Sequence, residues 1–133
     1  MAKRASGTFQ VENWEENPIL ETDDGAKVTR AEVQMSFEGD LEGEGVVEWL
    51  MGYAEDGTAT YVGLERVVGK VGDKTGSFVV QHTGTFDGKT AKSRLVVVPG
   101  SGTGELSGLR GEGSFEAGMG SDGQRNVSLE YDV

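Results

Sequence analysis

The stretch GSFVVQHTGTFDGKTAKSRLVVV, residues 76–98, decides the fold. It consists of two runs rich in valine, threonine and phenylalanine with Asp87-Gly88 between them. An Asp-Gly pair between two such runs is a strong signal for a β-hairpin with a two-residue loop. We therefore predict a hairpin in which Phe86 pairs with Lys89.

The predicted hairpin also assigns side chains to faces, because successive residues of a strand point to opposite sides. It places Gly84 opposite Ala91, His82 opposite Ser93, Val80 opposite Leu95 and Phe78 opposite Val97. Lys92 and Arg94 point the other way. The set that contains His82 is predicted to face the interior, since it holds the apolar and small residues.

A second hairpin is expected just before this one, with Lys74-Thr75 as its two-residue turn. It places Glu65 opposite Gly84, Val67 opposite His82 and Gly69 opposite Val80. Glu65 and His82 then become diagonal neighbours on the inward face. The outward face of the same strand carries an apolar stripe, for which an interface in a homo-oligomer is one explanation: Val62, Leu64 and Val68.

A third hairpin is predicted around residues 55–58, where the sequence is Glu-Asp-Gly-Thr. A two-residue loop brings Glu48 inward, opposite Glu65. A shift of one residue brings Trp49 inward instead. Both alternatives stay open, and both residues are kept as candidates for ligand binding.

The same rhythm of short strand-like runs and Gly or Asp turns continues along the chain. No segment of helical length keeps an apolar face without a glycine in it. Strands are predicted near residues 7–15, 27–38, 43–54, 59–71, 76–86, 89–98, 110–119 and 125–132. We therefore predict an all-β fold: one domain, residues 1–133, forming a single closed eight-stranded antiparallel β-barrel, which leaves no open sheet edge.

The amino-acid composition narrows the range of possible functions and partners. The 133 residues carry 12 Lys and Arg against 23 Asp and Glu, a formal net charge of -11, which repels nucleic acid and anionic lipid. No cysteine is present, and no apolar run is long enough to be a signal peptide or to span a membrane. We expect a soluble, cytoplasmic protein without a nucleic-acid or membrane partner. One histidine with scattered acids predicts no metal site, and no cofactor is predicted.

Glu65 and His82 carry the predicted chemistry. Burial beside apolar walls disfavours a charged carboxylate, and a neighbouring imidazole can hold or exchange its proton. The pair is therefore predicted to act as acid and base on a neutral substrate. The alternative, in which the two side chains only satisfy each other in the core, stays open.

Aromatic residues are the candidates for a ligand-binding wall, because a flat or apolar molecule packs well against them. Trp14, Trp49 and Tyr61 are predicted to line the cavity, with Ser93 beside His82. Residues 99–104, Pro-Gly-Ser-Gly-Thr-Gly, resemble a glycine-rich phosphate-binding loop. They lack the Gly-Lys-Ser/Thr ending and a following helix, so nucleotide binding is not predicted.

The longer run around this segment, residues 96–113, carries a family resemblance, together with residues 61–67 (YVGLERV) and 76–82 (GSFVVQH). In these segments the chain resembles the bacterial domain-of-unknown-function family DUF3224 over nearly its whole length. That family is similar in fold to allene oxide cyclases and dirigent proteins, which are eight-stranded barrels. The resemblance implies a cavity for a hydrophobic small molecule, an isomerase or cyclase reaction under acid-base and conformational control, and oligomers. The alternative is a non-catalytic binding or oligomeric structural protein.

Overall fold

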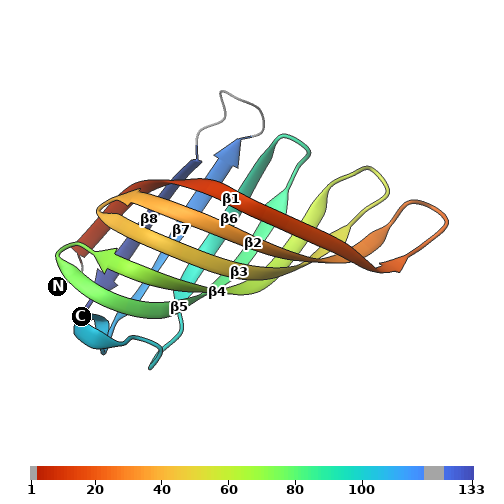
Figure 1. Cartoon of the computed structure of the whole chain (residues 1–133). Coiled ribbons are helices and arrows are strands. Elements are labelled where there is room, and N and C mark those ends of the chain that lie inside the picture. The colour runs from red at the N-terminus through yellow and green to blue at the C-terminus, as the bar shows by residue number, and fades with distance from the viewer. Residues whose placement is uncertain (1–2, 119–124) are drawn as a thin grey trace.

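The computed structural model describes residues 3–118 and 125–133. The strands follow in chain order as β1 (Lys3–Glu21), β2 (Lys27–Gly39), β3 (Leu41–Tyr53), β4 (Ala59–Val71), β5 (Lys74–Phe86), β6 (Thr90–Val97), β7 (Arg110–Gly118) and β8 (Arg125–Asp132) (Figure 1). A single turn of 3-10 helix, η1 (Gly104–Leu106), lies between β6 and β7. The predicted strand end at residue 119 lies outside the described residues. None of the helical segments in the described ranges is long and apolar enough to cross a membrane.

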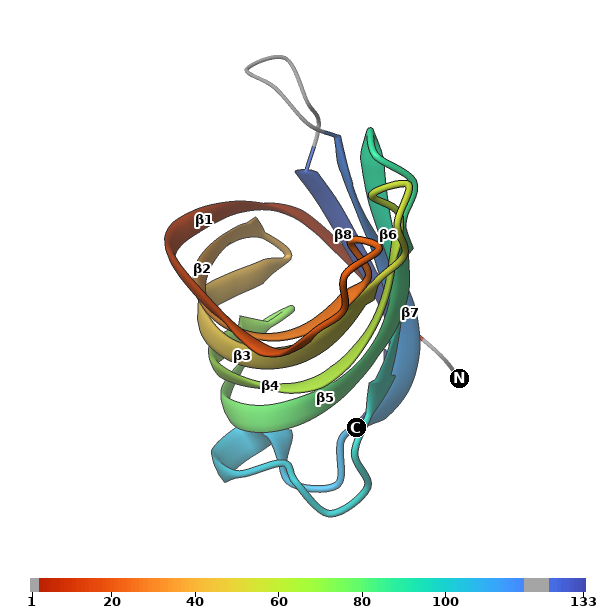
Figure 2. The same ribbon diagram turned by 90° about the vertical axis from the view of Figure 1, so that its right-hand side faces the viewer.

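The eight strands close into a barrel, as Figure 2 shows. Each strand pairs antiparallel with the next, and β1 pairs with β8 from Lys3↔Tyr131 to Thr8↔Asn126. This last pairing removes both sheet edges. The prediction of a closed eight-stranded antiparallel barrel is confirmed.

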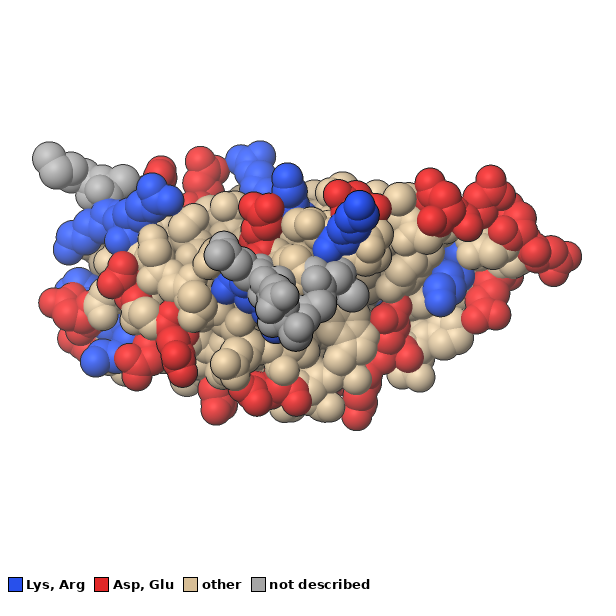
Figure 3. All heavy atoms as spheres, turned by 90° about the horizontal axis from the view of Figure 1, so that it is seen from above, with Lys and Arg blue, Asp and Glu red and all other residues tan. Residues whose placement is uncertain are grey.

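β1 and β2 are longer than predicted and run far out at one end of the barrel (Figure 1). Their pairing continues to Glu21↔Lys27, with register shifts between Val11 and Asn13 and between Pro18 and Leu20. Such shifts mark β-bulges, which bend a strand and change its twist. Figure 3 shows acidic side chains gathered at this end, where the hairpin carries Glu21, Asp23 and Asp24.

The register of the β5–β6 hairpin differs from the prediction by two residues. Phe86 pairs with Ala91, so His82 lies opposite Leu95 and Gly84 opposite Ser93. The loop is wider than two residues because the carboxylate of Asp87 accepts hydrogen bonds from the backbone N–H groups of Lys89 and Thr90. A shift of two preserves the faces, and the predicted inward set stays inward.

The β4–β5 turn is formed by Gly72-Asp73 instead of Lys74-Thr75, and Val71 pairs with Lys74. Gly72 has a φ of +62°, the backbone conformation that a tight hairpin requires at its first central residue. Glu65 consequently lies opposite Val80 and Gly63 opposite His82. The shift is again even, so the predicted diagonal contact of Glu65 with His82 survives.

The β3–β4 hairpin decides the alternative between Glu48 and Trp49. Tyr53 pairs with Ala59, and Val47 lies opposite Glu65. This register differs by one residue from the two-residue loop, so the faces are exchanged. Trp49 points into the barrel and is buried, whereas Glu48 points outward.

The glycine-rich segment between β6 and β7 closes the end of the barrel opposite the β1–β2 hairpin. Thr103 donates its backbone N–H to the carbonyl of Ser77 at 2.8 Å, and the Ser101 hydroxyl accepts the N–H of Val79 at 3.0 Å. These bonds replace the strand partner that β5 loses where β6 ends. A side chain at Gly76 or Gly102 would collide with the backbone of this segment, which explains the glycines.

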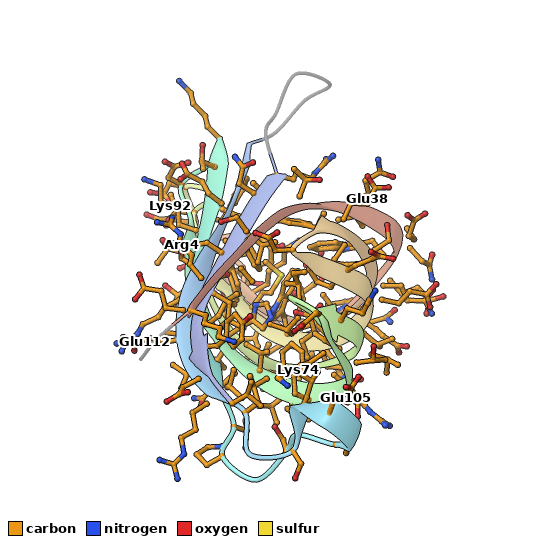
Figure 4. The ribbon with its side chains drawn as sticks, turned by 90° about the vertical axis from the view of Figure 1, so that its left-hand side faces the viewer. Arg4, Glu38, Lys74, Lys92, Glu105 and Glu112 are labelled. Atoms are coloured by element: carbon orange, nitrogen blue, oxygen red, sulfur yellow. The ribbon has the colours of Figure 1, made fainter. Side chains whose placement is uncertain are left out.

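Leu106 and Leu109 of this segment are completely buried and fill the closed end. In Figure 4 the labelled Glu105 and Lys74 lie together at that end, and Glu105 accepts the backbone N–H of Thr75 at 3.1 Å. The segment is therefore a structural plug of the barrel.

Truncation of the plug tests this assignment. Leu106→Ala is expected to lower the free energy of unfolding by about 2–5 kcal/mol, because it leaves a cavity in a fully packed site. Urea unfolding followed by circular dichroism measures it. The control Leu20→Ala, at an exposed position, is expected to change stability by less than about 0.5 kcal/mol. Equal effects of the two variants would contradict the plug.

Candidate functional site

A cavity of about 420 Å³ lies in the barrel at the end that carries the β3–β4 and β5–β6 hairpins. Its walls are mainly apolar and aromatic, and two charged residues line it, Glu16 of β1 and Arg125 of β8. The apolar and aromatic walls come from the seven strands β1 to β7 and include Phe9, Met35, Met51, Tyr61, Phe86, Ala91 and Phe115. The predicted cavity is therefore present, at the end opposite the plug.

Trp49 is the centre of the aromatic wall. Its ring centroid lies 5.5 Å from that of Trp14, 5.2 Å from Tyr61 and 6.2 Å from Phe115. Glycines on the neighbouring strands make room for these rings: a side chain at Gly63 would collide with Trp49, and one at Gly84 with Tyr61. Trp14 remains 43% exposed, so it forms the edge of the cavity.

Glu16 is held by a network of hydrogen bonds at the cavity wall. Its carboxylate accepts bonds from the Trp14 indole at 3.0 Å, and from the hydroxyls of Thr29 and Tyr53, each at 2.7 Å. Burial alone raises the pKa of Glu16, but the three hydrogen bonds and the charge of Lys27 outweigh it, and the net pKa is below the ordinary value. Glu16 is therefore ionised at neutral pH.

The hydrogen bond between Glu16 and Tyr53 shifts the pKa of Tyr53 in the opposite direction, upward. Burial, the hydrogen bond to Glu16 and the negative charge of Glu16 raise the pKa of Tyr53 to about 12. Burial also raises the pKa of Tyr61, although the hydrogen bond between its hydroxyl and that of Ser93, at 2.5 Å, opposes the shift. Both phenols stay protonated at neutral pH and can donate hydrogen bonds.

Glu65 and His82 form a pair deeper in the barrel. The Nε2 atom of His82 lies 2.8 Å from Oε1 of Glu65, and the residues are 0% and 3% exposed. Neither side chain lines the large cavity. The ring of His82 packs against Trp49 at 5.7 Å and Phe115 at 5.3 Å, two residues that do line it. The pair is thus separated from the cavity by an aromatic layer.

Three buried polar atoms in this region have no hydrogen-bond partner among residues 3–118 and 125–133: Nε1 of Trp49, Oε2 of Glu65 and Nδ1 of His82. A void of about 20 Å³ touches Glu65 on its far side, among apolar residues such as Phe37 and Phe78. Unsatisfied buried polar atoms are rare and costly, each about 1–3 kcal/mol. Their presence beside the aromatic layer is the most unusual chemical feature of the interior.

The structure brings together some of the residues predicted from sequence. Trp14, Trp49 and Tyr61 line one cavity, and Ser93 lies behind Tyr61 as its hydrogen-bond partner. Glu65 and His82 contact each other but are buried beneath that cavity. Glu48 does not join them: it points outward and forms an ion pair with Arg30 at 2.6 Å.

Glu16 is the main residue that the sequence reasoning missed. The predicted strand ended at residue 15, whereas β1 continues to Glu21. A signal was available, because Glu16 follows Trp14 by two residues and so shares its face. The prediction missed Glu16 because it ended the strand one residue too early, and because the bulge between Val11 and Asn13 shifts the faces relative to the start of β1.

These observations define the class of protein: a closed eight-stranded antiparallel barrel with an aromatic-lined cavity towards one end and a glycine-rich plug across the other. The chain belongs to the family of proteins of unknown function DUF3224, whose family model matches residues 5–131. No curated protein matches it significantly.

A solved structure supports the family. The chain is 31% identical to a DUF3224 protein of unknown function from Shewanella oneidensis MR-1, whose crystal structure was determined at 1.84 Å resolution. The match covers 99% of this chain and 98% of that one, with a TM-score of 0.78. The predicted family is confirmed, and the likeness to allene oxide cyclases and dirigent proteins stays a prediction.

The contact between Glu16 and Tyr53 can be tested by titration. In Glu16→Gln the pKa of Tyr53 is expected to fall from about 12 part of the way to its ordinary value of 10.0, since burial remains. Because the folded pKa is the raised one, the phenol stabilises the fold fully below pH 10 and loses this contribution as the pH rises through about 12. Tyrosinate absorbance measures the shift, with Tyr53→Phe to assign the transition.

Glu12→Gln is the matched control, because Glu12 lies on the same strand and accepts its bond from Ser36 instead. It is expected to leave the Tyr53 transition unchanged. An unaltered transition in Glu16→Gln would show that Glu16 does not contact Tyr53 in solution.

Proposed function

We propose that this barrel binds a small, largely apolar molecule in the cavity lined by Trp14, Trp49 and Tyr61. The cavity itself carries the proposal: its volume of about 420 Å³ falls in the range of about 300–1,000 Å³ typical of small-molecule sites. Its apolar walls with a few polar groups also match that type of site. A protein that needed only a stable barrel would gain by filling this space, since tight packing stabilises a core.

The charges around the cavity favour a neutral ligand. Glu16 is ionised and its carboxylate already accepts three hydrogen bonds. Arg125 contributes the opposite sign within the same lining, while the chain as a whole has a net charge of -11. An anion would be repelled by the protein's overall field. The ligand we expect is a neutral molecule with an apolar or aromatic body.

The two tryptophans of the chain both line the cavity, so tryptophan fluorescence reports its occupancy directly. N-phenylnaphthylamine, a neutral aromatic dye, is expected to bind and to accept energy from Trp14 and Trp49. Ala91→Phe places a ring in the cavity and is expected to weaken binding about tenfold or more, which corresponds to about 1.4 kcal/mol. Fluorescence titration measures both dissociation constants.

Ala54→Phe is the matched control, because Ala54 lies exposed in the β3–β4 loop and does not line the cavity. It is expected to bind the dye like the unmodified protein. Equal affinities of Ala91→Phe and the unmodified protein, or no dye binding at all, would overturn the proposed site.

A second candidate function is acid-base isomerisation or cyclisation of the bound molecule by Glu65 and His82. It is favoured by the unpartnered atoms Nε1 of Trp49, Oε2 of Glu65 and Nδ1 of His82. A ligand whose polar end passed the ring of Trp49 would satisfy them, and the hydrogen-bonded pair would then hold or exchange a proton with it. This step requires the aromatic layer of Trp49 and Phe115 to move.

Substituting Glu65 and His82, singly and together, distinguishes their contribution to stability from a role in ligand binding. His82→Leu is expected to lower the free energy of unfolding by about 3–5 kcal/mol, because it leaves Glu65 buried without a partner. The double variant Glu65→Met/His82→Leu is expected to recover most of that loss, because both polar groups are removed together. Urea unfolding measures the two effects.

Ligand binding by the folded double variant then tests the second candidate. A loss of about tenfold or more in dye affinity, about 1.4 kcal/mol, would support contact between the ligand and the pair. Unchanged affinity would limit Glu65 and His82 to the core. Since the chain has a single histidine, the imidazole NMR signals of His82 provide an independent reading of the same contact.

A further inference from the structure

The outer face of β3 and β4 carries a contiguous group of exposed apolar side chains, here called the β3–β4 patch: Val46, Leu50, Val62, Leu64 and Val68. Leu50 pairs directly with Val62, and Val46 is the diagonal neighbour of Leu64. Leu64 is 56% exposed. Single exposed apolar residues are ordinary, but a contiguous group of them marks an interaction surface.

The patch borders a groove of about 830 Å³ on the outside of the barrel. Four patch residues line it, together with Ile19 of β1 and Val79 of β5. Its charged lining residues are Arg30, Glu32, Glu48 and Arg66. The surface is therefore hollowed, apolar in the middle and charged with both signs.

Several charged groups on these strands have no hydrogen-bond or ion-pair partner within the described part of the chain. Arg66 of β4 and Glu44 of β3 are exposed, and neither forms a hydrogen bond or ion pair within the described residues. Glu48, in contrast, is engaged by Arg30 at 2.6 Å. Lys70 of β4 and Glu42 of β3 are likewise exposed without such a partner, so the outer face of these two strands offers free charges of both signs.

We propose that a second copy of this chain covers the β3–β4 patch in a two-fold symmetric dimer, in which Arg66 of each copy pairs with Glu44 of the partner subunit. A two-fold interface brings the same surface of both copies together, so that surface must be complementary to itself. The outer face of β3 and β4 meets this condition because it holds the apolar β3–β4 patch and free charges of both signs. A chain with a net charge of -11 would otherwise repel its own copy.

The strand arrangement permits the pairing. A two-fold axis running along the strands between β3 and β4 lays β3 of one copy over β4 of the other. Glu44 pairs with Val68 across the sheet, and Val68 is two residues from Arg66. The offset between Glu44 and the partner's Arg66 is therefore about 7 Å along the strand, and sheets packed face to face lie about 10 Å apart. The glutamate and arginine side chains both extend into that gap, so they bridge it together.

Sedimentation equilibrium of the full chain tests the proposal. The expected mass is twice the 14.1 kDa of one chain. Leu64→Asp is expected to give the mass of a single chain, because it places a charge in the middle of the patch. Leu20→Asp is the matched control at a similarly exposed leucine, 59% exposed and outside the groove, and is expected to stay dimeric.

Charge exchange tests the specific contact. Arg66→Glu and Glu44→Arg are each expected to be monomeric alone, because each places like charges opposite each other in the dimer. An equimolar mixture of the two is expected to form a heterodimer, because every contact then joins opposite charges. Circular dichroism confirms that each variant is folded.

A single-chain mass for the unmodified protein at the highest attainable concentration would overturn the proposal. So would a mixture of Arg66→Glu with Glu44→Arg that stays monomeric. A dimer that survives Leu64→Asp would place the interface elsewhere and would also overturn it. Dye binding in the cavity is read separately, so neither proposal depends on the outcome of the other.

Discussion

The narrow interior of an eight-stranded barrel is the constraint on which the rest of this structure depends. Such a barrel is just wide enough for side chains to fill it. Several of the largest inward side chains are therefore accommodated by a glycine on a neighbouring strand. Trp49 lies over Gly63, Tyr61 over Gly84, and Glu65 over Gly45, where an added side chain would collide in each case. Each of these inward glycines thus provides the space that a large polar or aromatic side chain occupies.

This constraint divides the barrel into a filled and a hollow part. Towards the plug, Val67, Val80 and Phe78 pack with Leu106 and Leu109 in one core. Towards the other end, the interior is left open beyond Trp49 and Tyr61, because small residues such as Ala91 and Ala117 face it. The Glu65–His82 pair lies between the two parts. A polar pair at this boundary is a structural cost in a sealed core.

The sequence predicted which side chains point into the barrel more accurately than it predicted which residues pair across the strands. The predicted hairpin pairings missed by two residues around Asp87 and by four around Gly72, yet Glu65 and His82 came out as inward neighbours because even shifts preserve faces. The loop errors arose from Asp87, whose carboxylate binds two backbone N–H groups, and from the positive φ of Gly72.

The site was predicted only in part, for two physical reasons. The predicted strand ended one residue before Glu16, and the bulge between Val11 and Asn13 shifts the faces of this segment relative to the start of β1. The depth of a residue along the barrel axis depends on strand tilt, which no local pattern contains. Trp49 and His82 share the interior, but the depth of His82 beneath the cavity followed only from the complete register.

The alternation that builds the cavity wall also builds the outer patch. Along β3 and β4, Trp49 and Tyr61 point inward while Leu50, Val62 and Leu64 point outward. The two proposed functions of these strands therefore use opposite faces of one backbone. An outward change such as Leu64→Asp leaves the inward side chains in place, so ligand binding and dimerisation are separable by mutation. Any coupling between them has to pass through the backbone of β3 and β4, where a partner subunit would restrain the strands that carry Trp49 and Tyr61.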